Sequence, residues 1–271
     1  MAGSLELSVA SFNLHAGVDG WGRPFDVVAA CRRIDADVLV LQECWSPDAG
    51  PGDAKAVGSA LGYDVFEREL ARGRRGGSHP AADDRWVRPM SWSGTSHALY
   101  LDSERPLPES VTTSRRYREA EPGGWGLAVL SRVPVEGHQV IDLGHVGRDR
   151  VRRAALALSV GGGALRVVGT HMAHLTYGSP VHFRKLARAL GSTPDEGPGV
   201  LAGDMNLWGP PVRALLPGWH RAVRGRTWPA WRPHSQVDHI LVRGPLHVVE
   251  GAVLAAAGSD HRPVRAVVRV P

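Results

Sequence analysis

Short apolar runs, most of them bounded by glycine, proline or aspartate, recur along the whole length of this 271-residue chain. Many of the runs alternate apolar and polar residues or are rich in β-branched residues, a pattern that favours strands over helices. We therefore predict a protein dominated by β-sheet. The predicted strands lie at 7–12, 37–42, 97–101, 126–130, 154–160, 164–170, 199–203, 237–242 and 263–270.

Helical patterns are fewer and lie at 24–34, 53–61 and 180–190, the last closed by Gly191. The mixture predicts an α/β protein. No repeat of fixed period is present, which argues against solenoids and propellers. No shift in composition divides the chain, so we expect a single domain over residues 1–271.

The least regular segment, residues 67–124, is rich in glycine, proline, serine and arginine. Loops of this length in a compact domain tend to be functional or mobile. Its basic and aromatic side chains are candidates for a surface that binds a phosphate-bearing substrate, and an ordinary solvated loop fits the pattern equally well. These side chains are Arg68, Arg72, Arg74, Arg75, Trp86 and Trp92.

Composition excludes several classes of protein. No run of eighteen or more apolar residues occurs, so we expect no transmembrane segment. The first residues show no basic region followed by a cleavage site, which favours a cytoplasmic location. Two cysteines, Cys31 and Cys44, are too few for a disulfide framework or a typical zinc site. The formal net charge of +5 favours an anionic partner such as nucleic acid, a phosphorylated metabolite or an acidic membrane surface.

A carboxylate and a carboxamide, Asp204 and Asn206, follow the apolar run at 199–203. Side chains two residues apart in an extended segment point to the same face, so these two groups are expected to converge at the mouth of a buried strand. Taken alone, aspartate and asparagine in this position are also ordinary turn formers.

Other polar residues stand at the ends of apolar runs in the same way, and each of them singly has an ordinary structural explanation. Together they supply the carboxylates, carboxamides and imidazoles that metal-assisted phosphoryl transfer needs. A hard ion such as Mg²⁺ prefers oxygen ligands and keeps several waters, so one or two carboxylates suffice. These residues are Asn13, His15, Glu43, His171, Asp238, His239, Asp260 and His261.

Six short blocks in this chain resemble, in the same order, the signature blocks of the endonuclease/exonuclease/phosphatase superfamily, in the form found in generic bacterial members. They span residues 11–263, nearly the whole chain. The blocks are Ser11-Phe12-Asn13, Leu41-Gln42-Glu43, Gly169-Thr170-His171, Gly203-Asp204-Met205-Asn206, Val237-Asp238-His239-Ile240-Leu241 and Gly258-Ser259-Asp260-His261-Arg262-Pro263.

The resemblance implies a four-layered α/β/β/α sandwich, in which two mixed, mainly antiparallel sheets of DNase I-like type pack face to face beneath outer helices. It also implies a phosphoesterase that depends on Mg²⁺ or Mn²⁺. Glu43 would then bind the metal, and Asn13 and Asp260 would complete the metal site.

The remaining matched residues would carry the chemistry. Asp204 would orient or deprotonate the attacking water, and Asp238 would orient His261. Asn206 would position water or phosphate oxygens, and His171 would contact the phosphate. Whether Asp204 or His261 accepts the proton is left open by the sequence.

Departures from particular branches bear on the substrate. His15 stands where AP-endonuclease relatives usually carry aspartate, which disfavours a DNA-repair role. The block around Asp238 differs from that of inositol-polyphosphate 5-phosphatases. The leading hypothesis is a nuclease-like phosphodiesterase. The alternatives are a phospholipid-cleaving, sphingomyelinase-like enzyme, a small-molecule phosphoesterase, and a non-catalytic phosphate-binding protein on the same fold.

A proline- and tryptophan-rich loop at 227–234 precedes the Asp238 block. It is a candidate wall of the substrate cleft, with Arg232 placed to meet phosphate. A loop held together by its own prolines is an equally good explanation of the pattern.

Overall fold

Two β-sheets packed face to face form the centre of the molecule. The computed structural model describes residues 5–76, 99–102, 107–146, 149, 151–191 and 197–271. The first sheet has the order β12 (His247–Val253), β13 (Val264–Val270), β1 (Leu5–Asn13), β2 (Val38–Pro47), β5 (Glu121–Ser131), β3 (Asp64–Arg75) and β4 (Leu99–Asp102). The second has the order β10 (His220–Arg221), β11 (Asp238–Arg243), β9 (Gly199–Asp204), β8 (Leu165–His171), β7 (Arg153–Val160) and β6 (Val135–Gly144).

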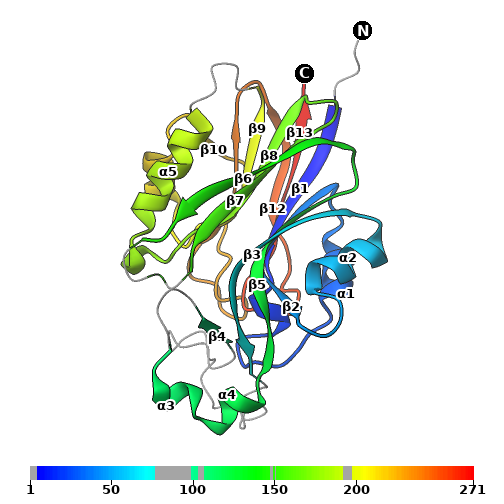
Figure 1. Ribbon diagram of the computed structural model, residues 1–271. Coiled ribbons are helices and arrows are strands. Elements are labelled where there is room, and N and C mark those ends of the chain that lie inside the picture. Colours follow the sequence, from blue (N-terminus) through cyan, green and yellow to red (C-terminus); the bar gives the residue numbers. More distant parts are fainter. Residues whose placement is uncertain (1–4, 77–98, 103–106, 147–148, 150, 192–196) are drawn as a thin grey trace.

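Helices cover the outer faces of the two sheets. Helices α1 (Val27–Ile34) and α2 (Asp53–Leu61) pack on the first sheet, and α5 (Ser179–Gly191) and α6 (Gly209–Leu215) pack on the second. Figure 1 shows α1 and α2 on one side of the molecule and α5 on the other. Two short helices, α3 (Glu109–Thr112) and α4 (Arg115–Glu119), lie beside β4 at the far end of the first sheet. The predicted four-layered sandwich is thus confirmed.

The central core is built from β-branched and leucine side chains that alternate along the strands. Val9, Val40 and Val129 of the first sheet belong to the same buried cluster as Val167 and Ile240 of the second. Most neighbouring strands are antiparallel, but β1 pairs with β2 and β8 pairs with β9 in parallel. The carboxyl ends of two parallel neighbours lie at the same end of a sheet. These two pairs therefore bring four carboxyl ends together at one end of the sandwich.

Several strands lack the apolar runs that the sequence prediction used. Strands β6 and β12 lie at sheet edges and are largely exposed, so few of their side chains are buried. In the segment predicted to be irregular, residues up to Arg75 belong to β3, and β5 begins at Glu121. The predicted strand at 97–101 is seen as β4 over its described part, and Trp86 and Trp92 lie outside the described residues.

The boundaries of the predicted helices are close to those observed. Helix α2 has the predicted bounds, whereas α1 begins at Val27 rather than at Pro24. Asp26 caps α1, because its carboxylate accepts a hydrogen bond of 2.8 Å from the backbone N–H of Ala29. Pro24 lies before this cap, in a bridge to Val18.

The arginines of β3 are used within the protein. Arg72 forms ion pairs with Asp48 and Glu69, and Arg75 pairs with Glu121 at 2.8 Å. Arg74 donates to the carbonyl oxygen of Ala120 at 2.8 Å. These contacts give three of the four arginines in the predicted basic cluster a structural role.

Two further findings concern composition. Both cysteines, Cys31 and Cys44, are buried and free. Among the described residues, none of the helices has the length and the apolar character that crossing a membrane requires.

Asp53 at the start of α2 gives a testable dependence of stability on pH. Its Oδ2 accepts a hydrogen bond of 2.8 Å from the N–H of Trp45, and burial raises the pKa of Asp53 to about 6. A raised carboxyl pKa means that the folded state resists ionisation. The resulting penalty is absent below the unfolded pKa near 4, grows between about pH 4 and pH 6, and is constant above that range.

Asp53→Asn keeps an acceptor for Trp45 but removes the buried charge. We expect this variant to be more stable than the original protein by about 2 kcal/mol at pH 8, with the difference vanishing near pH 4. Urea unfolding at both pH values measures it. A difference that does not change with pH would show that Asp53 ionises as easily in the folded as in the unfolded chain.

Candidate active site

Polar side chains meet where the parallel strand pairs end. Asn13 ends β1, His171 ends β8 and Asp204 ends β9. His171 lies opposite Asp204 in the β8–β9 register, and Asp238, the first residue of β11, lies opposite Asp204 on its other side. The register of three neighbouring strands therefore places His171, Asp204 and Asp238 in one row at the end of these strands.

A β-bulge turns Glu43 toward this row. In the β2–β5 ladder Gln42 pairs with Leu127 and Cys44 pairs with Gly126, so Glu43 is the extra residue. Its φ of 53° is unusual for a residue with a side chain. Leu41 and Cys44 both face the helix layer, and the extra residue allows Glu43 to leave that face.

The glycine opposite the bulge accommodates the irregular backbone. A Cβ at Gly126 would lie 2.4 Å from the carbonyl oxygen of Arg68 in β3. The ladder between β3 and β5 is itself irregular at this level, between Glu69 and Ala71. Both neighbours of β5 are thus distorted where Glu43 enters the site.

Glu43, His171 and Asp204 form a first group of side chains, and Asn13 links its two carboxylates. Its Nδ2 donates to Glu43 Oε1 and to Asp204 Oδ2, each at 3.0 Å. Its Oδ1 accepts from the backbone N–H of His15 at 2.9 Å. His171 Nε2 lies 3.8 Å from Glu43 Oε1 and 3.7 Å from Asp204 Oδ2. In this arrangement Asn13 orients the carboxylates through its nitrogen.

Asn206 is held over the same group. Its backbone has a φ of 49°, and its N–H donates to Asp204 Oδ1 at 2.8 Å. Its side-chain Nδ2 donates to the carbonyl oxygen of Met172 at 2.9 Å and lies 3.3 Å from His171 Nε2. Positive φ values recur at site residues His15, Glu43 and Asn206, which is where backbone strain tends to gather.

A second group is formed by Asp238 and His261. His261 Nδ1 donates to Asp238 Oδ2 at 3.0 Å, and its Nε2 lies 3.9 Å from Asp204 Oδ2 and 4.0 Å from Asp260 Oδ1. All four side chains are buried. Asp204 is the carboxylate shared by the two groups.

Electrostatics separate the roles of these side chains. Burial disfavours the charged form of His261, but the carboxylates of Asp238, Asp260 and Asp204 outweigh it and hold the pKa of this imidazole well above its usual range. Burial raises the pKa of Asp204 to about 7, against the opposing charge of His261. His261 is therefore a cation at neutral pH, whereas Asp204 takes up a proton more readily than an ordinary aspartate.

Asp260 lies beside the second group in a shell of donors. Its Oδ2 accepts from Trp228 Nε1 at 3.1 Å, and His15 Nδ1 lies 3.6 Å from its Oδ1. Burial alone would raise the pKa of this carboxyl, but His15, His261 and these hydrogen bonds outweigh it and lower the pKa.

Two side chains that the sequence analysis did not identify complete the site. Trp125 Nε1 lies 3.4 Å from Glu43 Oε2, and its ring lies 5.3 Å from that of His171. The guanidinium of Arg153 lies 5.4 Å from the centre of the Trp125 ring. Burial and the charge of Arg153 keep the pKa of His171 well below its usual range, so His171 is neutral. In the sequence, the feature that could have indicated Trp125 is its position between glycines at 123–126.

The first group has the chemistry of a site for a hard divalent ion. Glu43, His171 and Asp204 each offer a ligand atom, and these atoms lie within 4.8 Å of one another. The two carboxylates suit Mg²⁺ or Mn²⁺, whereas the neutral imidazole is a more usual ligand of softer ions. Asp204, Asp238 and His261 are equally close, but a protonated His261 has no free nitrogen for a metal. Within the described part of the chain, Asp260 belongs to neither group.

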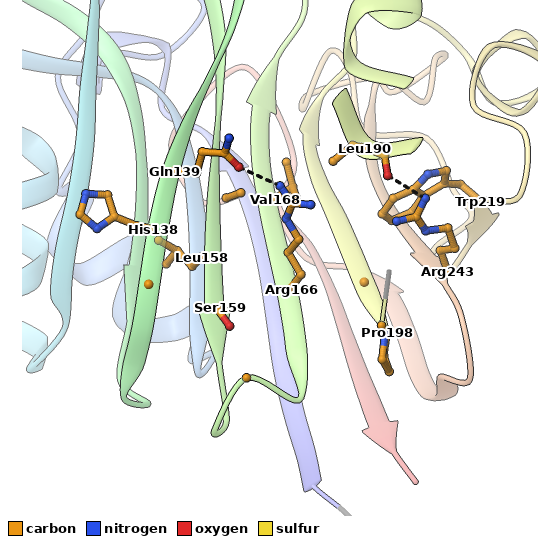
Figure 2. A pocket seen from close by; sticks show the side chains of 15 residues that line it. His138, Gln139, Leu158, Ser159, Arg166, Val168, Leu190, Pro198, Trp219 and Arg243 are labelled. Carbon is orange, nitrogen blue, oxygen red and sulfur yellow. Dashed lines mark hydrogen bonds between the residues drawn. The ribbon is translucent and has the colours of Figure 1, made fainter. Parts of the chain in front are cut away.

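A separate hollow of about 500 Å³ lies on the outer face of the second sheet. Figure 2 shows Arg166 and Gln139 on one side of it and Trp219 with Arg243 on the other. Arg166 donates to Gln139 at 3.1 Å, and Arg243 donates to the carbonyl oxygen of Leu190 at the end of α5. None of the eight predicted site residues lines this hollow.

Comparisons with known proteins agree with this architecture. The Endonuclease/Exonuclease/phosphatase family matches residues 10–261. Protein YbhP of Escherichia coli K12 is 24% identical over 279 residues, covering 97% of this chain and 96% of YbhP.

Two solved structures have the same fold. A mannosyl-6-phosphatase of Bacteroides thetaiotaomicron VPI-5482 has a TM-score of 0.63 at 17% identity, covering 97% of this chain and 99% of that chain. TDP2 of D. rerio, complexed with a single-strand DNA product, has a TM-score of 0.58 at 17% identity, covering 97% and 98%.

Proposed function

This chain belongs to the endonuclease/exonuclease/phosphatase family, and from that premise we propose that it hydrolyses phosphodiester bonds with the help of a divalent metal ion. The observation that carries the proposal is that Glu43 and His261, from separate segments, both lie close to the buried carboxylate of Asp204. Structural relatives that act on a sugar phosphate or bind a DNA product support phosphoester chemistry.

Glu43 is the residue that we assign to the ion, which is Mg²⁺ or Mn²⁺. Asn13 holds the Glu43 carboxylate in place, and His171 and Asp204 offer further ligand atoms beside it. A bound ion supplies positive charge next to a phosphoryl oxygen. The Asp260 carboxylate lies close to the imidazoles of His261 and His15. We place Asp260 outside the immediate contacts of the ion.

Asp204 is the group that we assign to deprotonating the attacking water. Burial raises its pKa to about 7, which matches the working range of a general base near neutral pH. Asn206 fixes one oxygen of Asp204 through its backbone N–H and leaves the carboxamide near His171. Asn206 is thus placed to bind a phosphate oxygen beside the ion.

His261 is the cation that we assign to the charge that develops on the phosphate. Asp238 accepts its Nδ1–H and keeps the ring oriented, so Nε2–H points away from Asp238. A fixed donor of this kind stabilises a transition state that spreads negative charge over oxygens. The hydrogen bond from His261 Nδ1 to the Asp238 carboxylate also helps to keep the imidazole protonated.

The experiment that tests this function uses the full chain with bis(4-nitrophenyl) phosphate and 4-nitrophenyl phosphate. We expect hydrolysis of the diester with Mg²⁺ or Mn²⁺, its loss with EDTA, and its recovery when excess metal is restored. Stabilisation by metal without hydrolysis of either ester, of DNA or of a phospholipid would instead support a non-catalytic phosphate-binding protein.

Glu43→Gln tests the metal assignment directly. A ligand that binds the folded state raises stability, so metal near ten times its dissociation constant should add about 1.4 kcal/mol to the free energy of unfolding. We expect Mn²⁺ to stabilise the original protein and to have little effect on Glu43→Gln in urea unfolding. Glu69→Gln is a matched control, because Glu69 is exposed on β3 and pairs with Arg72. Equal stabilisation of all three proteins would place the ion elsewhere.

A further inference from the structure

Two tryptophans from loops far apart in the sequence meet beside the site. Trp21 lies in the loop at 18–24, and Trp231 lies in the loop at 227–235. Their ring centres are 4.9 Å apart, with an angle of 53° between the ring planes. The guanidinium of Arg23 lies 5.2 Å from the centre of the Trp21 ring. The pair is therefore a contact between two loops that are far apart in the sequence.

The second loop is bonded to Asp260, and the first follows a residue that lies beside it. The backbone N–H of Ala230, next to Trp231, donates to the carbonyl oxygen of Asp260 at 2.7 Å. Trp228 Nε1 donates to the Asp260 carboxylate at 3.1 Å. On the other side, His15 Nδ1 lies 3.6 Å from the same carboxylate and begins the short helix η1 (His15–Gly17), which leads into the first loop. The tryptophan pair is thus carried by segments whose neighbouring residues contact Asp260.

Hydrogen bonds hold each loop in shape. In the second loop Arg262 donates from its backbone N–H to Thr227 O at 2.9 Å and from Nε to Ala230 O at 2.9 Å. In the first loop Asp19 accepts from the N–H of Trp21 at 2.8 Å and from Arg23 Nε at 2.8 Å. Rigid aromatic side chains lose little entropy when a ligand binds, so such a pair is suited to recognition.

Trp231 remains 38% exposed although it packs on Trp21. The ring therefore packs against Trp21 and is open to solvent elsewhere. A planar aromatic ligand would cover it by stacking.

We propose that Trp231, backed by Trp21, is a stacking platform that selects phosphodiesters bearing a nucleoside. The proposal rests on the proposed function, because it adds a base-binding surface to the phosphodiesterase site. It assigns specificity to two loops outside the residues that carry out hydrolysis. In this arrangement Trp231 contacts the base, and Trp21 is a positioning residue that supports its ring.

The test compares two substrates with the same leaving group, thymidine 5′-(4-nitrophenyl) phosphate and methyl 4-nitrophenyl phosphate. Stacking of one base on an aromatic ring contributes to the free energy of binding. We therefore expect Trp231→Ala to lower kcat/KM for the thymidine ester by about tenfold, chiefly through KM. The methyl ester should be cleaved as before. Trp231→Phe should restore most of the preference, and Trp208→Ala, which removes an exposed tryptophan from another loop, should leave the ratio unchanged.

A binding measurement tests the platform without turnover. With Mg²⁺ present, thymidine 5′-monophosphate should bind more tightly than inorganic phosphate, and Trp231→Ala should remove that difference in calorimetry. Equal losses for both esters in Trp231→Ala, or an unchanged binding difference, would overturn the platform while leaving the phosphodiesterase intact. Hydrolysis of neither ester by the original protein would count against the proposed function, and the calorimetry would still decide the platform.

Discussion

Asp204→Asn is expected to lower kcat for phosphodiester hydrolysis by about a thousandfold or more. General base catalysis typically contributes between about a hundredfold and ten-thousandfold, and Asp204 also offers a ligand atom for the proposed ion. The asparagine keeps the shape of the side chain and an oxygen for the backbone N–H of Asn206. The loss is therefore expected in kcat, as measured with bis(4-nitrophenyl) phosphate at saturating metal.

The metal-free Asp204→Asn protein should unfold at a temperature close to that of the original, because removal of a buried carboxylate offsets the loss of an acceptor for Asn13 Nδ2. This comparison separates a catalytic effect from misfolding. Asp142→Asn is a suitable control, because Asp142 is an exposed carboxylate on β6 that pairs with Arg152. If Asp204→Asn retained a tenth or more of the original kcat, Asp204 would not be the base.

Asp149→Ala is expected to destabilise the protein by about 3–5 kcal/mol, the usual cost of removing one partner from a buried ion pair. Asp149 Oδ2 accepts from Arg153 Nε at 2.7 Å, and both side chains are less than a tenth exposed. Arg153 Nη1 is already buried without a hydrogen-bond partner. The substitution would leave the whole guanidinium without an opposite charge, and urea unfolding at pH 7 measures the loss.

The double variant Asp149→Ala with Arg153→Met provides the control. Replacing both members of a buried ion pair by apolar groups is often close to neutral, so the double variant should recover most of the lost stability. If Asp149→Ala alone cost less than about 1 kcal/mol, water would reach Arg153 in the folded protein. If the double variant were no better than the single one, the ion pair would not be the origin of the loss.

The sequence was informative where strands are buried. Runs such as 37–42 and 199–203 must be apolar because both of their faces are covered, and each lies in an observed strand. Strands β6 and β12 escaped prediction because they are edge strands with exposed faces, so their side chains follow no apolar pattern. Local sequence reports burial more directly than it reports hydrogen bonding.

The site was predicted in part for a related reason. Residues that end neighbouring parallel strands of one sheet, such as His171 and Asp204, can be placed near one another from sequence order and sheet geometry. Trp125 and Arg153 could not, because they reach the site across two different sheets and carry no local signal of that contact. Their positions depend on how the two sheets pack.

The bulge at Glu43 also affects how relatives of this chain should be compared. Side chains of a regular strand alternate, so the same three letters Leu41-Gln42-Glu43 on an unbulged β2 would direct the glutamate into the helix layer. A homologue could then keep the motif in its alignment column and have lost the carboxylate from its catalytic centre. Conversely, deleting one residue near Glu43 would remove function while leaving every named site residue in the sequence. Counting matched motif letters is thus an insufficient criterion for an intact site, and the pairing of β2 with β5 has to be inspected as well.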